Sequence, residues 1–101
     1  MPASSEQVPA DSEQVPASSE QVVVLPKHLH ARPAGQVAQA AARYADTTIE
    51  LFADGRSADA RSILAVLGLG AVAGNDVRVR AVGDDAVRAA TAIIAILAAP
   101  E

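Results

Sequence analysis

The 101-residue chain contains no Cys and no Trp, and its only aromatic residues are Tyr44 and Phe52. The absence of Cys excludes disulfides, thiolate metal sites and cysteine nucleophiles. Hydrophobic residues still make up 50% of the chain, so a core must be built from Val, Leu, Ile and many Ala. Nucleic-acid binding requires a basic face with stacking aromatics, and this chain offers neither. Length and composition therefore predict one small domain that binds no nucleic acid.

Long hydrophobic runs and targeting signals are also lacking. The N-terminus shows neither the basic region nor the apolar run of a secretory signal. The longest apolar stretch follows Asp85, is interrupted by Arg88 and stops at Pro100, so it is too short to span a bilayer. We therefore expect a cytoplasmic protein without a membrane partner.

Negative charge is concentrated in a repeat near the N-terminus. Residues 2–22 read PASSEQV, PADSEQV, PASSEQV. The acidic residues of the repeat are Glu6, Asp11, Glu13 and Glu20. Of the 12 Asp and Glu residues, these four supply the net charge of −4, because the other eight balance eight Lys and Arg residues. One Pro and one Val per repeat exclude a coiled coil. We expect residues 1–19 to be a disordered acidic extension and residues 20–101 to form the domain.

Hydrophobic patterns predict four strands. The β-branched stretch QVVVLP indicates a strand over about residues 20–26. TTIELFA alternates over residues 47–53, and the Asp-Gly pair that follows is a strong hairpin signal, so residues 56–60 are the expected return strand. Val alternates with Arg in residues 76–82, as in a strand with one face on the core and the other in water.

Three helices are predicted in the remaining segments. The first covers residues 31–45 because apolar residues recur there at helical spacing. Those residues are Ala34, Val37, Ala38, Ala41 and Tyr44. Ser62 opens a short helix, SILAVL, that ends at Gly68 and Gly70. Asp84 is expected to cap the last helix. The predicted apolar side of that helix comprises Val87, Ala90, Ile94 and Leu97.

The resulting order is β-α-β-β-α-β-α. We therefore expect an α+β fold, an open-faced β-sandwich in which three helices cover one face of a four-stranded, mainly antiparallel sheet. The uncovered face of the sheet would carry Glu50, Arg78 and Arg80.

A histidine stands at the predicted start of the first helix, within KHLHARPAG (residues 27–35). A helix start leaves backbone amides without partners and carries partial positive charge, and Pro33 marks the boundary. A phosphoryl group on the imidazole of His30 could accept hydrogen bonds from the amides near Ala31 and Arg32. The Arg32 guanidinium could add charge-assisted bonds. The plain alternative is that His30 is an ordinary first-turn residue beside a surface arginine.

Imidazole suits a group carrier because much of it is neutral near pH 7, which leaves a ring nitrogen available as a nucleophile. His28 and His30 also suggest a metal pair. Two histidines without a Cys or a third ligand nearby are poor evidence for such a site, so we expect neither a metal nor a cofactor.

LHARPA, followed about thirty residues later by ARSILAVLGLG, resembles HPr, the histidine-containing phosphocarrier of the bacterial phosphoenolpyruvate:sugar phosphotransferase system. The resemblance covers about residues 20–99 and includes the order of elements. It implies that His30 accepts a phosphoryl group from Enzyme I and donates it to a sugar-specific IIA protein. Arg32 and Pro33 are then the arginine and proline of the motif. Such a protein carries a covalent phosphohistidine and is not a stand-alone enzyme.

The resemblance also implies regulation and docking. Ser62 corresponds to a serine that, in some bacteria, a kinase/phosphorylase modifies, which recruits a transcriptional regulator. The alternative is that Ser62 only caps its helix. Partner docking is expected on the first two helices. The residues expected to take part are Lys27, Ile63, Leu64 and Leu67. A positive rim is expected from Lys27, Arg32, Arg43 and Arg61.

Two features depart from the family pattern. The family usually has Gly two residues before the active histidine, where this chain has His28, and the N-terminal repeat lies outside the pattern altogether. Two further functions stay open: a regulatory binding module of the same fold, or a carrier for a dihydroxyacetone or nitrogen-related branch. The presence of both His30 and Arg32 argues against the binding module.

Overall fold

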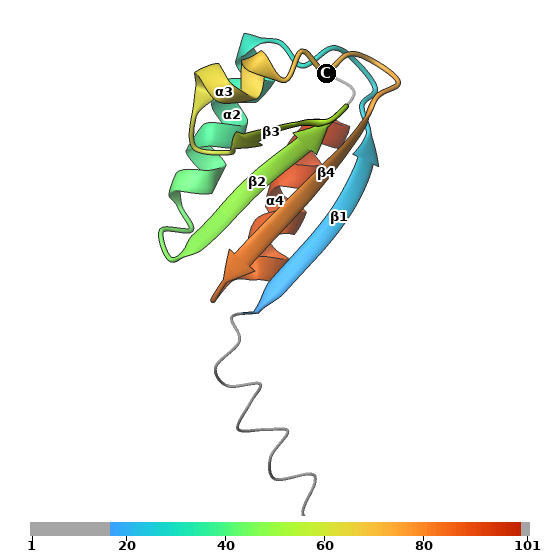
Figure 1. The fold of residues 1–101 in the computed structure, drawn as a ribbon. Coiled ribbons are helices and arrows are strands. Elements are labelled where there is room, and N and C mark those ends of the chain that lie inside the picture. The colour runs from blue at the N-terminus through green and yellow to red at the C-terminus, as the bar shows by residue number, and fades with distance from the viewer. Residues whose placement is uncertain (1–16, 100–101) are drawn as a thin grey trace, which may run out of the picture.

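The computed structural model describes residues 17–99, and Figure 1 shows their arrangement. Within this part of the chain four strands form one sheet in the order β1-β4-β2-β3, and each pairing is antiparallel. The strands are β1 (Ser18–Val24), β2 (Thr47–Ala53), β3 (Arg56–Asp59) and β4 (Asp76–Gly83). The helices of the same part, which lie on one face of the sheet, are α2 (Ala31–Ala42), α3 (Ile63–Gly68) and α4 (Ala86–Ala98). The predicted open-faced α+β sandwich is confirmed.

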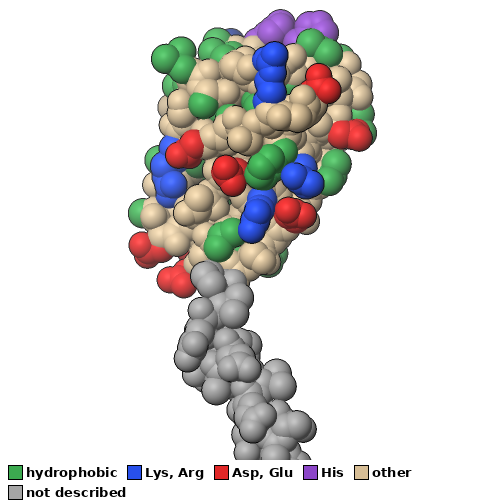
Figure 2. Space-filling model, viewed as in Figure 1, with side chains coloured by type: hydrophobic (Ala, Val, Ile, Leu, Met, Phe, Trp, Pro, Cys, Tyr) green, Lys and Arg blue, Asp and Glu red, His purple; other side chains and the backbone are tan. Residues whose placement is uncertain are grey.

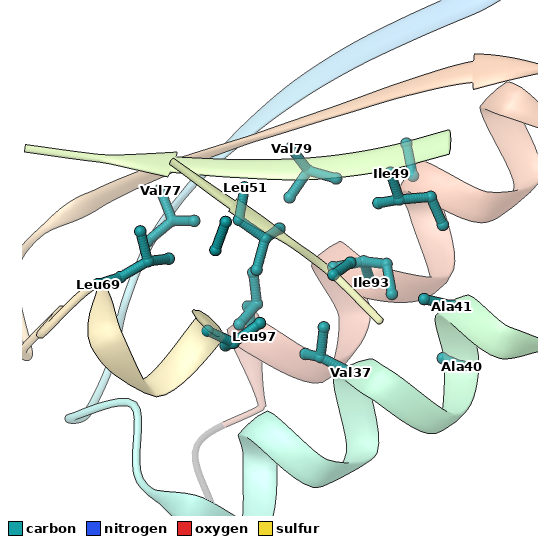
Figure 3. Close-up of a cluster of buried hydrophobic side chains, with 14 of the residues drawn as sticks. Val37, Ala40, Ala41, Ile49, Leu51, Leu69, Val77, Val79, Ile93 and Leu97 are labelled. Carbon is teal, nitrogen blue, oxygen red and sulfur yellow. The ribbon is translucent and has the colours of Figure 1, made fainter. Parts of the chain in front are cut away.

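The core is a layer of aliphatic side chains between the sheet and the helices (Figure 3). Alternation along the strands directs every second side chain of β2 and β4 toward the helices. The sheet contributes Ile49, Leu51, Val77 and Val79, and the helices contribute Val37, Ile93 and Leu97. Burying each of these side chains stabilises the fold by about 1.5–3 kcal/mol. As the composition predicts, this core contains no buried aromatic ring among the described residues.

The strand boundaries follow the predictions closely, apart from β1. β2 covers the predicted residues, and the Asp54-Gly55 turn has positive φ at both positions, 53° and 79°, as a two-residue hairpin requires. β1 was predicted over residues 20–26 but ends at Val24. The N–H of Leu25 donates instead to the carbonyl of Asn75 in another loop, at 2.9 Å. β1 also starts within the predicted extension, whose residues 1–16 lie outside the described part of the chain.

The first helix is shorter than predicted, ending at Ala42 where the apolar spacing extended to residue 45. The amides of Arg43 and Tyr44 donate to carbonyls three residues back, which tightens and ends the last turn. Of the predicted apolar face, Ala38 and Tyr44 are only partly buried.

The prediction for the last helix was wrong in two respects. Its N-cap is Asp85 rather than Asp84, and the Asp85 side chain makes no capping bond. Val87 was assigned to the buried side but is 65% exposed. The buried residues are Ala86, Ala89, Ala90, Ile93 and Leu97. None of the helices of residues 17–99 combines the length and the hydrophobicity that a membrane-spanning helix requires.

The second face of the sheet is free of helices, as predicted (Figure 1). Arg78 and Arg80 are exposed on it, and Glu50 is partly buried. Charges of both signs are mixed over this face in Figure 2. The Arg78 guanidinium lies 4.6 Å from the ring centre of Phe52, and its Nε lies 3.9 Å from a carboxylate oxygen of Glu20. The face therefore has no strong net charge.

Candidate functional site

The segment that joins β1 to α2 presents two imidazoles to solvent. Leu29 is buried, and its N–H donates to the carbonyl of Ala71 at 3.1 Å. His28 and His30 flank it and are both exposed. Their ring centroids lie 5.6 Å apart with the planes tilted by 55°, and Figure 2 shows both side chains together at one end of the molecule. Leu29 thus anchors the segment in the core and leaves both histidines outside.

α2 begins directly after His30, as predicted. His30 is the N-cap, with extended backbone (φ −90°, ψ −176°), and its carbonyl accepts the N–H of Ala34 at 3.1 Å. Its side chain makes no capping bond. Within residues 17–99, neither the N–H of Ala31 nor that of Arg32 donates a hydrogen bond, and Pro33 has no N–H. Two free amides therefore stand at the positive end of a 12-residue helix.

A cavity of about 260 Å³ adjoins this helix start. Its lining residues are Lys27, His28, His30, Arg32 and Pro33. Two of these side chains are cationic and none is acidic, so the cavity suits an anion. A charge-assisted hydrogen bond is worth about 1.5–3 kcal/mol when well formed, and less at an exposed position such as Arg32.

A larger depression of about 600 Å³ lies on the open face of the sheet. It combines Arg56 and Arg78 with Asp54 and Asp76, so its charges cancel. It contains no imidazole. The smaller cavity at the start of α2 is the better candidate for phosphoryl chemistry, because a nucleophile and an anion-binding surface meet there.

The two histidines differ in what holds their rings. The Nδ1 of His28 accepts the N–H of Ala73 at 3.0 Å, across 45 positions of sequence. By contrast, no hydrogen bond from another described residue reaches the His30 ring. An attacking nitrogen needs a free lone pair, and of the two rings only that of His30 has both nitrogens unengaged by a described residue. Sequence reasoning missed the contact of His28, because nothing local to residues 27–35 indicates it.

His28 also fits its backbone position without strain. Among the described residues other than Gly, only Asp54 has a positive φ. The Gly of the family pattern is therefore not needed here for its conformational freedom.

Ser62 caps α3, as predicted. Its Oγ accepts the N–H of Ala65 at 3.1 Å, and its carbonyl accepts that of Val66 at 3.0 Å. The docking residues predicted just beyond it differ in exposure: Leu64 is 82% exposed and Ile63 44%, whereas Leu67 is partly buried against the core. α3 lies beside α2 (Figure 1), so Ile63 and Leu64 are available to a partner that also reaches α2.

Arg43 and Arg61 do not contribute to the expected rim around His30. Both lie at the opposite end of α2, because a 12-residue helix is about 18 Å long. The Nη2 of Arg61 donates to the carbonyls of Tyr44 and Thr47 at 2.8 and 3.0 Å. Its function is therefore structural, and only Lys27 and Arg32 supply positive charge at the cavity.

Comparison with known proteins agrees with this geometry. Residues 17–99 match the family model described as the HPr component of the phosphotransferase system with its phosphorylation site. The phosphocarrier HPr of Bacillus anthracis is 29% identical with a TM-score of 0.73, over 80% of this chain and 98% of that one.

Two other solved structures are similar over most of the domain. HPr-C-His of Thermoanaerobacter tengcongensis is 31% identical with a TM-score of 0.71, over 78% of this chain and 90% of that one. The catabolite repression protein Crh of Bacillus subtilis, a swapped intertwined dimer, is 30% identical with a TM-score of 0.60, over 76% and 91%. With its fold, its motif and its histidine at the helix start, the chain belongs to the HPr family of phosphotransferase-system phosphocarriers.

Proposed function

We propose that His30 accepts a phosphoryl group from Enzyme I, with phosphoenolpyruvate as the ultimate donor, and passes it to a IIA-type protein for sugar uptake. The observation that carries this proposal is an exposed imidazole, unengaged by other described residues, at the N-terminus of α2. The free amides of Ala31 and Arg32 lie next to it. The side chains of Lys27 and Arg32 line the same cavity.

The chemistry needs one nucleophilic nitrogen and several donors to the phosphoryl oxygens. The lone pair of a neutral His30 nitrogen attacks phosphorus, a nitrogen–phosphorus bond forms, and the bond from phosphorus to the donor protein breaks with its electron pair leaving on the donor. The Arg32 guanidinium and the two amides then bind the oxygens of the dianion. In the transfer to IIA, a nucleophile of IIA attacks the same phosphorus atom. The nitrogen–phosphorus bond to His30 then breaks, and its electron pair returns to the ring nitrogen.

The exposure of the site supports a carrier function. A carrier must release its phosphoryl group as readily as it accepts it, and both partners must reach the same nitrogen. A cavity whose lining includes the exposed side chains of His30 and Arg32 allows both contacts, while the nearby α3 offers exposed Ile63 and Leu64 as apolar contacts. We infer that Enzyme I and IIA bind in turn over this surface, with Lys27 at its edge.

The proposal is tested by incubating the full chain with phosphoenolpyruvate and Enzyme I. We expect acid-labile phosphate on the wild type, localised to His30 by mass spectrometry of fragments, and none on His30→Ala. Addition of purified IIA proteins from different branches then identifies the recipient. A wild type that takes up no phosphate, or phosphate found on His30→Ala, contradicts the proposal. A wild type that takes up no phosphate favours the regulatory binding module, for which the similarity to Crh is the supporting observation.

Modification of Ser62 by a serine kinase stays a prediction. Its hydroxyl is only partly buried. A phosphate there would add about two negative charges beside Ile63 and Leu64. Such charge would weaken binding of an acidic partner surface, which Ser62→Asp tests by comparison with Ser62→Ala in the Enzyme I assay.

A further inference from the structure

His28 lies where a second phosphate-binding side chain would be expected. Its ring is exposed, lies 5.6 Å from that of His30 between centroids, and lines the same cavity. Figure 2 shows the two imidazoles as neighbours at one end of the molecule. A phosphoryl oxygen is two bonds from the ring nitrogen that carries the group, so at a centroid separation of 5.6 Å such an oxygen on His30 can reach the His28 ring.

A contact from a distant loop determines which His28 nitrogen is left to donate a hydrogen bond. The N–H of Ala73 donates to Nδ1 at 3.0 Å, so Nδ1 carries no proton, and in the neutral ring the proton is on Nε2. The loop itself is held in place: the Ala71 carbonyl accepts the N–H of Leu29 at 3.1 Å, and the Gly74 N–H donates to the carbonyl of Leu25 at 2.9 Å. His28 is therefore a pre-oriented hydrogen-bond donor.

We propose that the Nε2–H of His28 donates a hydrogen bond to the phosphoryl group carried by His30, so that His28 is a phosphate-binding residue of the charged protein. This inference rests on the proposed function of His30. The roles of the two rings are complementary. The engaged Nδ1 makes His28 a donor, whereas the ring of His30 keeps the lone pair that attacks phosphorus.

The expected consequence is a shift in the phosphoryl-transfer equilibrium. The hydrogen bond exists only when His30 is phosphorylated, so it favours the phosphorylated protein over the unphosphorylated one. A glycine at this position, as in the family pattern, has no side-chain donor. This chain should therefore hold its phosphoryl group more tightly than a His28→Gly variant of itself.

The first test measures the equilibrium constant for transfer between Enzyme I and the full chain, in mixtures of phosphoenolpyruvate and pyruvate. We expect His28→Ala to lower this constant about three- to ten-fold, the effect of one exposed hydrogen bond to a charged group. His28→Gln, whose amide can accept the N–H of Ala73 and still donate, should stay within about two-fold of the wild type. Equal constants for the wild type and His28→Ala overturn the inference.

The second test detects the hydrogen bond itself and does not use Enzyme I. Phosphoramidate charges an imidazole directly, with the phosphoryl group passing to the ring nitrogen and ammonia leaving. In protein labelled with ¹⁵N-histidine, charging His30 should move the His28 Nε2–H proton downfield and slow its exchange with water, while the Ala73 amide stays in place. An unchanged His28 signal, or phosphate on His28 itself, overturns the inference.

The two tests separate this inference from the proposed function. If phosphoramidate charges the wild type but Enzyme I does not, the transfer function is wrong and the spectroscopic test of His28 still stands. If Enzyme I phosphorylates the wild type, but His28→Ala leaves the equilibrium constant unchanged and the His28 signal does not move, only the inference is wrong. Failure of phosphoramidate to charge His30 contradicts both, since both need an accessible nucleophile.

Discussion

The two ends of α2 use their backbone groups in opposite ways. At the C-terminal end the carbonyls of Ala40 and Ala41 accept the amides of Arg43 and Tyr44. Just beyond it, Arg61 donates to the carbonyls of Tyr44 and Thr47. At the N-terminal end the amides of Ala31 and Arg32 make no hydrogen bond to any residue between 17 and 99. The protein itself therefore satisfies backbone groups at the C-terminal end of α2, which we call the closed end. It leaves the amides of Ala31 and Arg32 at the N-terminal end, the open end, available to a ligand.

This difference separates stability from function within one element. Changes at the closed end should lower the free energy of unfolding and leave phosphoryl transfer intact. Changes at the open end should lower transfer and leave stability intact. The expected effects below run from the largest to the smallest.

Replacing His30 with Ala should abolish charging completely, because the nucleophilic nitrogen is lost. Its ring caps nothing and is exposed, so the free energy of unfolding should change by less than about 0.5 kcal/mol. Charging by Enzyme I and chemical denaturation of the same preparation measure the two quantities. A large loss of stability would show that His30 is structural.

Replacing Gly83 of β4 with Ala should lower the free energy of unfolding by about 3 kcal/mol or more, because Gly83 lies against Asp46 and Thr47 just beyond the closed end. Gly83 has φ +140°, and an added Cβ would overlap the carbonyl oxygen of Asp46 and lie 2.8 Å from the Cα of Thr47. Denaturant titration measures the loss. The matched control is Gly35→Ala inside α2, where an added Cβ meets nothing within 4 Å, and where we expect a gain of about 0.5–1 kcal/mol. Similar losses at both glycines would contradict this account.

Replacing Arg32 with Ala should lower the transfer equilibrium constant about ten-fold, the loss of a charge-assisted bond at an exposed site. Unfolding should be unaffected. Arg43→Ala is the matched control, because Arg43 is an exposed arginine at the other end of the same helix. Equal effects of the two substitutions on transfer would show that net charge, and not position, matters.

Replacing Arg61 with Ala should give the smallest effect, a loss of about 1 kcal/mol of stability, because two carbonyls lose a partially exposed donor. Charging of His30 should not change. Thermal unfolding measures the loss of stability, and the Enzyme I assay measures phosphorylation of His30. Reduced charging with unchanged stability would restore Arg61 to the docking rim.

Local patterns in the sequence predict much of this fold. β2 follows from strict alternation in TTIELFA, and the turn after it from Asp54-Gly55. The start of α2 follows from Pro33 in the first turn, and the cap of α3 from the hydroxyl of Ser62. Each of these signals acts within a few residues, so neighbouring sequence is enough to read it.

Tertiary contacts account for what the sequence could not predict. The ring of His28 is oriented by Ala73, 45 residues away, and Arg61 is held by the carbonyls of Tyr44 and Thr47, in the loop after α2 and at the start of β2. Val87 satisfies a helical spacing, but the small residues Ala86 and Ala89 are buried instead. Periodicity alone does not choose between adjacent sides of a helix as apolar as α4.

The central claim is that a phosphoryl group on His30 is bound by the open end of α2. It is tested most directly by NMR of the phosphorylated, ¹⁵N-labelled protein, with ³¹P spectra for the phosphoryl group and ¹H–¹⁵N spectra for the backbone amides. We predict one phosphorus resonance coupled to a ring nitrogen of His30, and downfield shifts confined mainly to the amides of Ala31 and Arg32. Phosphorus coupled to another residue, or unmoved amides at the start of α2, would contradict the account.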